Sequence, residues 1–296
     1  MGAEIFFILT VEQLINKYWR RKMIHELERN QFYRCKDLVN RGVNIEEKAI
    51  VEGINPGRIF VDNIDKPTSG LIWMGNNDGF IFIGDSKNKT FNQDIKRYID
   101  DVITLQAKGH GIEWFECIGN HQSWYTTFYE IFNKKNLKSW DQNVYMISPS
   151  SFNAKANHQN YDNEFKVSKQ TKEFLENAEI ENIEFVKSKI MDFWEDEKKF
   201  FEQGIGFCIL HKHYVVSLCI TGFRYKDFHG INIETIKSYQ GRKLAQRVVS
   251  YFVDYCFAKG FRPYWDCMET NHPSNAVARN IGFIKEFGYK GYEFRL

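Results

Sequence analysis

Residues suited to binding an anion stand together where one strand pattern ends and a helix pattern begins. The stretch IETIKSYQGRKLAQRV, residues 233–248, changes there from alternating β-branched residues to an amphipathic helix. Gly241 opens the helix, and Arg242 and Lys243 follow it. A helix N-terminus carries backbone N–H groups without internal partners and a partial positive charge, and glycine lets a ligand approach closely. The stretch therefore predicts a phosphate site at the start of this helix.

A second polar stretch, ETNHPSNAVARNIGF at residues 269–283, follows the next strand pattern. Asn271 closes that strand, Ser274 stands three residues further on, and a short helix runs to Gly282 and Phe283. This order predicts a polar corner between the strand and the short helix.

Together the two stretches resemble the GNAT superfamily of acyl-CoA N-acyltransferases. The phosphate loop of that family runs from a Gln or Arg to a Gly or Ala, and QGRKLA places Gln240 first, Gly241 second and Ala245 last. Lys243 occupies the central glycine position, where its side chain would either crowd the pyrophosphate or add a contact to it. In the second stretch, the Asn, the small residue and the closing Gly-Phe pair also fit the family pattern.

The resemblance implies acetyl-CoA as the cosubstrate, with pantetheine lying between two strands that splay apart. The phosphate loop would hold the pyrophosphate, and backbone groups on the strand before it would bond the pantetheine amides. No metal is implied. The implied cofactor-binding residues are Ile233, Glu234, Thr235, Gln240, Gly241, Arg242, Lys243, Leu244, Ala245, Asn271 and Ser274.

The implied chemistry is direct attack of an amine on the thioester, which needs a base, a stabilised oxyanion and an acid for the departing thiolate. Glu234, at the mouth of the splay, is the first candidate for the base, unless it only pairs with Lys237 or Arg242. Glu269 is the second candidate, and it could instead bind a cationic substrate. Ala278 stands where many members of the family carry an acidic tyrosine.

Other reactive side chains near the site have simpler interpretations. Cys267 suggests a covalent intermediate, but a buried core thiol is favoured. His229 and His272 flank the site and have the right pKa range for a proton shuttle, but surface-loop histidines are favoured. Trp265 and Asp266 are interpreted as packing and a polar neighbour.

The elements that must position these residues occur twice. The order strand, strand, strand, helix, strand, helix, strand is predicted for residues 57–149 and again for residues 206–296, with mostly helical segments at 11–39 and 167–202. A polar stretch at 149–166 suits a linker. The predicted fold class is α/β (α+β): tandem GNAT-like domains, each a mixed, mostly antiparallel sheet flanked by helices.

The predicted domains are residues 1–150 and 151–296. The pair resembles the two-domain GNAT proteins grouped with the zwittermicin A resistance acetyltransferase. The first half has no phosphate loop, since SKNKTFNQDI, residues 86–95, offers no glycine at its helix start. This half is predicted to be degenerate and to bind no CoA; it would cover the substrate cleft of the second half, extend the sheet, or be a purely structural duplicate.

Bulk properties exclude several classes of protein. Hydrophobic residues make up 43% of 296 residues and charged residues 26%, which is ordinary globular composition. A net charge of +2 gives no case for nucleic-acid binding. The 6 cysteines form no CxxC pair, so neither a zinc site nor a disulfide scaffold is indicated. No apolar run reaches the roughly 18 residues of a membrane helix. A cytoplasmic protein without membrane or nucleic-acid partners is predicted.

These observations predict an acetyl-CoA-dependent N-acetyltransferase that acetylates the amine of a small molecule in a ternary complex. Two alternatives stay open: a transferase of the same architecture with another acyl or aminoacyl donor, and a non-catalytic CoA-binding or regulatory protein. Lys243 and Ala278 are the residues that favour the non-catalytic alternative. Neither stretch identifies the acceptor.

Overall fold

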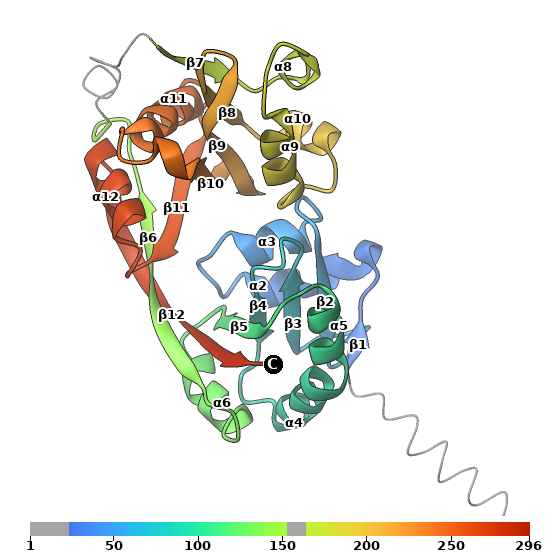
Figure 1. Cartoon of the computed structure of the whole chain (residues 1–296). Coiled ribbons are helices and arrows are strands. Elements are labelled where there is room, and N and C mark those ends of the chain that lie inside the picture. Colours follow the sequence, from blue (N-terminus) through green and yellow to red (C-terminus); the bar gives the residue numbers. More distant parts are fainter. Residues whose placement is uncertain (1–23, 153–163) are drawn as a thin grey trace, which may run out of the picture.

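The computed structural model describes residues 24–152 and 164–296 (Figure 1). Within these ranges one sheet of 12 strands runs through both halves of the chain, in the order β1-β2-β3-β4-β5-β12-β6-β11-β10-β9-β8-β7. The strands are β1 (His25–Glu26), β2 (Gly57–Val61), β3 (Ser69–Met74), β4 (Phe80–Gly84), β5 (Trp114–Gly119), β6 (Lys138–Met146), β7 (Phe165–Lys169), β8 (Gly206–His211), β9 (Tyr214–Tyr225), β10 (Phe228–Thr235), β11 (Arg262–Met268) and β12 (Ile284–Arg295).

Helices cover both faces of this sheet. In the first half they are η1 (Arg29–Cys35), α2 (Lys36–Val39), α3 (Glu46–Val51), α4 (Lys89–Tyr98), the π-helical η2 (Ile99–Ile103), α5 (Thr104–Gly109) and α6 (Trp124–Ile131). In the second half they are α8 (Lys172–Glu176), α9 (Ile183–Met191), α10 (Glu197–Gln203), η3 (Lys237–Tyr239), α11 (Leu244–Ala258) and α12 (His272–Ile281).

The two halves have the same strand arrangement, which confirms the predicted element order. Strands β2, β3 and β4 pair antiparallel and β5 joins β4 in parallel, just as β8, β9 and β10 pair antiparallel and β11 joins β10 in parallel. The last strand of each half is exchanged: β6 pairs with β11, and β12 pairs with β5. Figure 1 shows these two strands, β6 in green and β12 in red, running side by side from one half of the molecule to the other.

Several predicted elements differ from the structure. The helix predicted over 11–39 lies partly outside the described residues, and His25–Glu26 forms the edge strand β1 against Phe60 and Val61. Residues 167–169, predicted to be helical, belong instead to strand β7, which pairs antiparallel with β8 from Phe165 to Lys169. The predicted linker falls largely on residues 153–163, outside the described ranges. Helix α3 was not predicted.

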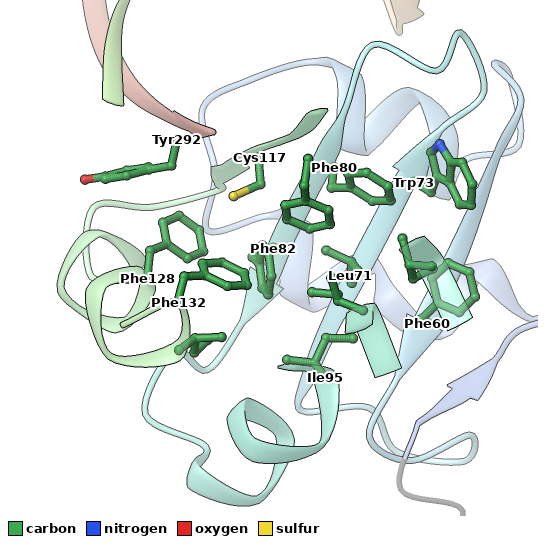
Figure 2. Packing of buried hydrophobic residues seen from close by; sticks show 14 of the residues in the cluster. Phe60, Leu71, Trp73, Phe80, Phe82, Ile95, Cys117, Phe128, Phe132 and Tyr292 are labelled. Carbon is green, nitrogen blue, oxygen red and sulfur yellow. The ribbon is translucent and has the colours of Figure 1, made fainter. Parts of the chain in front are cut away.

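Large aromatic side chains fill the core of the first half. Figure 2 shows the cluster beneath α4 and α6, where Phe82 meets Phe128 with ring centroids 4.9 Å apart. The exchanged strand β12 contributes to this cluster, since Phe294 stacks on Phe115 at 5.0 Å. The equivalent cluster in the second half lies beneath α11 and α12. Burial of rings from the far end of the chain therefore ties the two halves together.

In residues 24–152 and 164–296, no helix is long and apolar enough to cross a membrane. All six cysteines lie in these ranges, and each is a buried free thiol. The exchanged strands join both halves in a single continuous sheet, so the sheet itself marks no boundary between domains. The domain division at residue 150 therefore stays a prediction.

Candidate active site

Strands β10 and β11 part in the middle of the second half. They pair in parallel only where Phe228–Gly230 meets Arg262–Tyr264. Beyond that point β10 pairs with β9 as far as Thr235, and β11 pairs with β6 as far as Met268. The carboxyl ends of the two strands therefore open a gap in the sheet, the place where α/β sheets commonly bind ligands.

A cavity of about 700 Å³ opens at this gap on the face that carries α11, a volume within the range of about 300 to 1,000 Å³ typical of ligand pockets. All of the residues expected to bind the cofactor line it except Arg242. The Arg242 guanidinium lies instead 5.5 Å from the centroid of the Tyr239 ring. The structure thus brings two stretches separated in sequence to one cavity, with Trp265 between them.

The side chain of Lys243, the N-cap residue of α11, makes no capping hydrogen bond to the start of the helix. Gly241 has φ +79°, and an added Cβ would meet nothing within 4 Å, so glycine serves the backbone conformation and leaves open space. Lys243 also adopts a left-handed conformation, with φ 59° and ψ 18°. Such a conformation is costly for a residue with a Cβ. The Gln240 amide donates to the Thr235 carbonyl at 3.1 Å and ties the loop to β10.

The matching helix of the first half begins differently. The Asn88 side chain caps α4 by accepting the Phe91 N–H at 3.1 Å. Beyond three parallel pairs, β4 ends at Gly84 and β5 at Gly119, whereas β10 continues to Thr235 and β11 to Met268. The helix start of the first half is therefore capped by a side chain and has shorter strands beside it.

Asn271 and Ser274 shape the wall of the cavity. The Asn271 side chain accepts the Ser274 N–H at 3.1 Å and caps α12. The Ser274 hydroxyl accepts the Trp265 indole N–H at 3.1 Å. Both residues thus fix the indole and the first turn of α12 on the side of the cavity opposite the loop.

A second cavity, of about 230 Å³, lies on the other face of the same gap. Side chains alternate along a strand, so Tyr264 and Asp266 face this cavity while Trp265 faces the first. The second cavity is also lined by three further carboxylates, Glu46, Asp78 and Glu116, from the first half of the chain.

Asp266 is the best-placed titratable group at the gap. It accepts hydrogen bonds from the Tyr289 hydroxyl at 2.6 Å and from the Gln142 amide. Burial raises the pKa of Asp266 to about 6, although these two hydrogen bonds oppose the shift. Burial, together with the charges of Asp266 and Glu47, raises the pKa of Glu46 well above its ordinary value. Two carboxyls with different environments thus face one cavity, a pattern typical of acid and base roles.

The predicted bases lie at different places. Glu234 lines the cavity beside α11 and is exposed. Glu269 is exposed and lines neither cavity at the gap; its backbone N–H donates to the Asp141 carbonyl at 2.8 Å. Asp266 was interpreted only as a polar neighbour, although the alternation in YWDC placed it opposite Trp265. No pattern in the sequence indicated that Glu46 would lie at the site.

The histidines and Cys267 do not form a second reactive centre. The interpretation of His229 as a surface-loop residue was wrong, because it is only 1% exposed in β10. Its ring nitrogen lies 2.9 Å from the Thr221 hydroxyl, and burial lowers its pKa to about 3. His272 is exposed at the start of α12. Cys267 is buried, and burial raises the pKa of its thiol, which disfavours a thiolate nucleophile.

Ala278 is fully buried in the core beneath α11 and α12. It offers no proton to a departing thiolate. The place where the resemblance leads one to expect an acidic tyrosine is therefore filled by a buried methyl group.

Comparison with known proteins identifies the family. The chain is 25% identical over 236 residues to an uncharacterized N-acetyltransferase, YdfB, of Bacillus subtilis, covering 79% of this chain and 84% of that protein. A GCN5-related N-acetyltransferase-like protein from Streptococcus suis has the same fold, with a TM-score of 0.64 at 20% identity, over 90% of this chain and 99% of that one.

A tandem GNAT protein from the clavulanic acid biosynthesis pathway also shares the fold, with a TM-score of 0.59 at 8% identity, over 92% of this chain and 98% of that one. The sequence profile of the GNAT acetyltransferases matches residues 36–292 and so includes both halves. With the splayed strands and the uncapped helix start at one cavity, this match assigns the chain to the GNAT acetyltransferase family.

Proposed function

We propose that this N-acetyltransferase moves an acetyl group from acetyl-CoA to the amine of a small molecule by direct attack in a ternary complex. The observation that carries the proposal is the gap between β10 and β11, which opens to a cavity on each face. The cavity at the uncapped helix start suits a pyrophosphate. The acidic cavity on the other face suits an amine, so the two substrates would meet through the sheet.

Different residues of the first cavity would bind different parts of the cosubstrate. Backbone N–H groups from Gly241 to Ala245 would bond the pyrophosphate, and the Lys243 ammonium would add a charge contact. Backbone groups of Ile233–Thr235 would bond the pantetheine amides along the unpaired edge of β10. Asn271 and Ser274 would keep the opposite wall in place.

Asp266 is our proposal for the base. The acceptor enters as an ammonium, and Asp266 would take its proton so that the nitrogen can attack the thioester carbon. A carbon–nitrogen bond then forms and the carbon–sulfur bond breaks, while the second proton lost by the nitrogen passes through water to the departing thiolate, which leaves as the free thiol. A base is most effective when its pKa lies near the working pH, and the Asp266 pKa of about 6 fits this condition. Glu234, on the other face, is the second candidate.

Incubation with acetyl-CoA and a library of amines tests the proposal. Intact-mass measurement should find at least one product heavier by an acetyl group, with free CoA released only when that acceptor is present. CoA binding without any acceptor-dependent release, across acetyl and longer acyl donors, would show a binding protein and overturn the proposal.

A further inference from the structure

The acidic cavity has a lining unusual for an interior space. Both halves of the chain contribute carboxylates: Glu46 from α3, Asp78 from the turn between β3 and β4, Glu116 from β5 and Asp266 from β11. None of the residues that line it, all within the described ranges, is Lys, Arg or His. Four carboxylates with no internal cation repel one another, and their arrangement does not help the protein to fold.

The carboxylates are near enough to influence one another. Burial and the charges of Asp78 and Glu293 raise the pKa of Glu116, and the charge of Asp78 also acts on Asp266. Asp78 is therefore close enough to act on both Asp266 and Glu116. Burial raises the pKa of Asp78 as well, because the surrounding chain removes part of its water although the residue keeps an exposed edge.

Tyr264 gives independent evidence of a ligand. It is 3% exposed and lines the cavity, yet its hydroxyl has no hydrogen-bond partner among the residues that the structure describes. The Glu46 Oε2 atom is likewise buried without a hydrogen-bond partner in the described part of the chain. Buried polar groups nearly always have partners, and leaving one unpaired is costly. A donor bound in the cavity would pair with both oxygens.

The lining of this cavity suits an organic cation better than a metal ion. Among the described residues, no group of three or more His, Cys, Asp or Glu could hold a metal ion, so these carboxylates are too far apart for that role. Aromatic rings complete the walls, including Trp140 and Phe80, and rings of this kind favour ammonium groups and the carbon chains between them. The volume of about 230 Å³ limits the occupant to a small molecule.

We propose that this cavity selects an acceptor that carries two amines: one faces Asp266 at the gap, and the second, protonated amine lies between Asp78 and Glu116. The inference rests on the proposed function, because it names the class of acceptor for the same site. Asp78 and Glu116 are thus specificity-determining residues that hold the end of the acceptor that does not react.

Calorimetric titration of the CoA-saturated protein tests this inference without requiring turnover. The probes are putrescine, butylamine and gamma-aminobutyrate, which share a four-carbon chain but end in a second ammonium, a methyl and a carboxylate. Putrescine should bind at least about tenfold more tightly than the other two, the scale of one partly desolvated charge pair. The double variant Asp78→Asn, Glu116→Gln should lose this preference.

Two controls separate the effect from misfolding. Glu130→Gln removes an exposed carboxylate of α6 outside both cavities and should keep the preference. Tyr264→Phe removes only the unpaired hydroxyl and should weaken putrescine binding a few-fold. Equal affinity of wild-type protein for the three probes would overturn the inference whether or not the double variant folds.

The same reagents separate this inference from the proposed function. If putrescine binds as expected but acetyl-CoA yields no acetylated amine, the transfer proposal fails and the cation site stands. If amines are acetylated with no preference for diamines, and the double variant changes nothing, the transferase stands and the diamine site is wrong.

Discussion

Gly241 is the residue that tests the cosubstrate site most directly. Gly241→Trp should abolish the rise in melting temperature that CoA produces by binding the folded state, because the new side chain would occupy the open space in front of the helix start. Gly260 is a matched control: its φ is +73° and its Cβ position is equally open, but it lies outside the cavity.

Both substitutions force a left-handed conformation on a residue with a Cβ and should cost roughly 1 to 2 kcal/mol of stability. Only the Gly241 variant should lose the response to CoA, as differential scanning fluorimetry can show. A CoA shift that survives Gly241→Trp rules this loop out as the pyrophosphate site.

Asp266, Glu234 and Glu269 can be ranked as bases by kinetics. Asp266→Asn keeps the shape but removes the base, so kcat/KM should fall by about 10²-fold or more. The acid limb of the pH profile, expected near pH 6 from the Asp266 pKa, should also disappear. Glu269→Gln should leave kcat almost unchanged. If Glu234→Gln has the largest effect and removes the acid limb, the proton leaves on the CoA side instead.

At the residue scale, the sequence predicts what is local. The loop residues from Gln240 to Ala245 are neighbours in the chain, and a glycine at a helix start has a direct physical meaning. The acidic cavity could not be predicted, because Glu46 and Asp266 are 220 positions apart and meet only through the packing of α3 against the second half. Their raised pKa values arise from burial, which no sequence pattern reports.

At the scale of elements, α4 and α11 are equivalent in order but not in chemistry. The Asn88 side chain caps the start of α4, whereas the N-cap residue of α11, Lys243, makes no side-chain cap, so one CoA is expected for each chain. Isothermal titration should give a stoichiometry near one. Gly241→Trp should reduce it to none; a saturable CoA site that survives this change would contradict the degenerate first half.

Strand and helix patterns predicted most of these elements because period-two and period-3.6 burial are local properties. The exception at the C-terminus is instructive. The patterns FIKEFGY, residues 283–289, and GYEFRL, residues 291–296, indicate two strands, but residues 284–295 form the single strand β12 with a bulge between Lys285 and Phe287. Gly291 faces the Trp140 ring, whose atoms would lie 2.1 Å from an added Cβ. This glycine makes room for the neighbouring strand and does not end its own.

At the scale of the whole molecule, buried carboxyls should make stability depend on pH. Glu47 is fully buried, and neither of its carboxylate oxygens has a hydrogen-bond partner within residues 24–152 and 164–296. Burial raises its pKa from 4.5 to about 8. Between these two pKa values the folded state holds a proton that the unfolded state has lost. The contribution of Glu47 to the free energy of unfolding is therefore fully present below about pH 4.5 and is lost as the pH rises toward 8.

Glu47→Gln keeps the shape and removes this titration. The variant should be more stable than the wild type at pH 8 by about 2 to 4 kcal/mol, with a much smaller difference at pH 5, as urea denaturation at the two values can measure. Glu52→Gln, at an exposed position just after the same helix, is the control. An equal gain at both pH values would show that Glu47 is not the titrating group.

The exchanged strands determine how the whole molecule unfolds. Strand β6, from the first half, pairs with β11 on one side and with β12 on the other, over Tyr264–Met268 and Ile284–Glu293. Without it, the second half would expose two unpaired strand edges at the middle of the sheet, a state prone to aggregation. We therefore expect one cooperative transition, with equal calorimetric and van't Hoff enthalpies.

Fragments test the same point. Residues 1–152 and 153–296 should be insoluble or unfolded when produced separately, and they should recover a folded sheet and the CoA response when produced together, since β6 and β12 each complete the other half. Near-ultraviolet circular dichroism follows the buried rings around Phe294 and Trp124. If the second fragment folds alone and binds CoA with native affinity, β6 is dispensable, and each half closes its own sheet without the exchange.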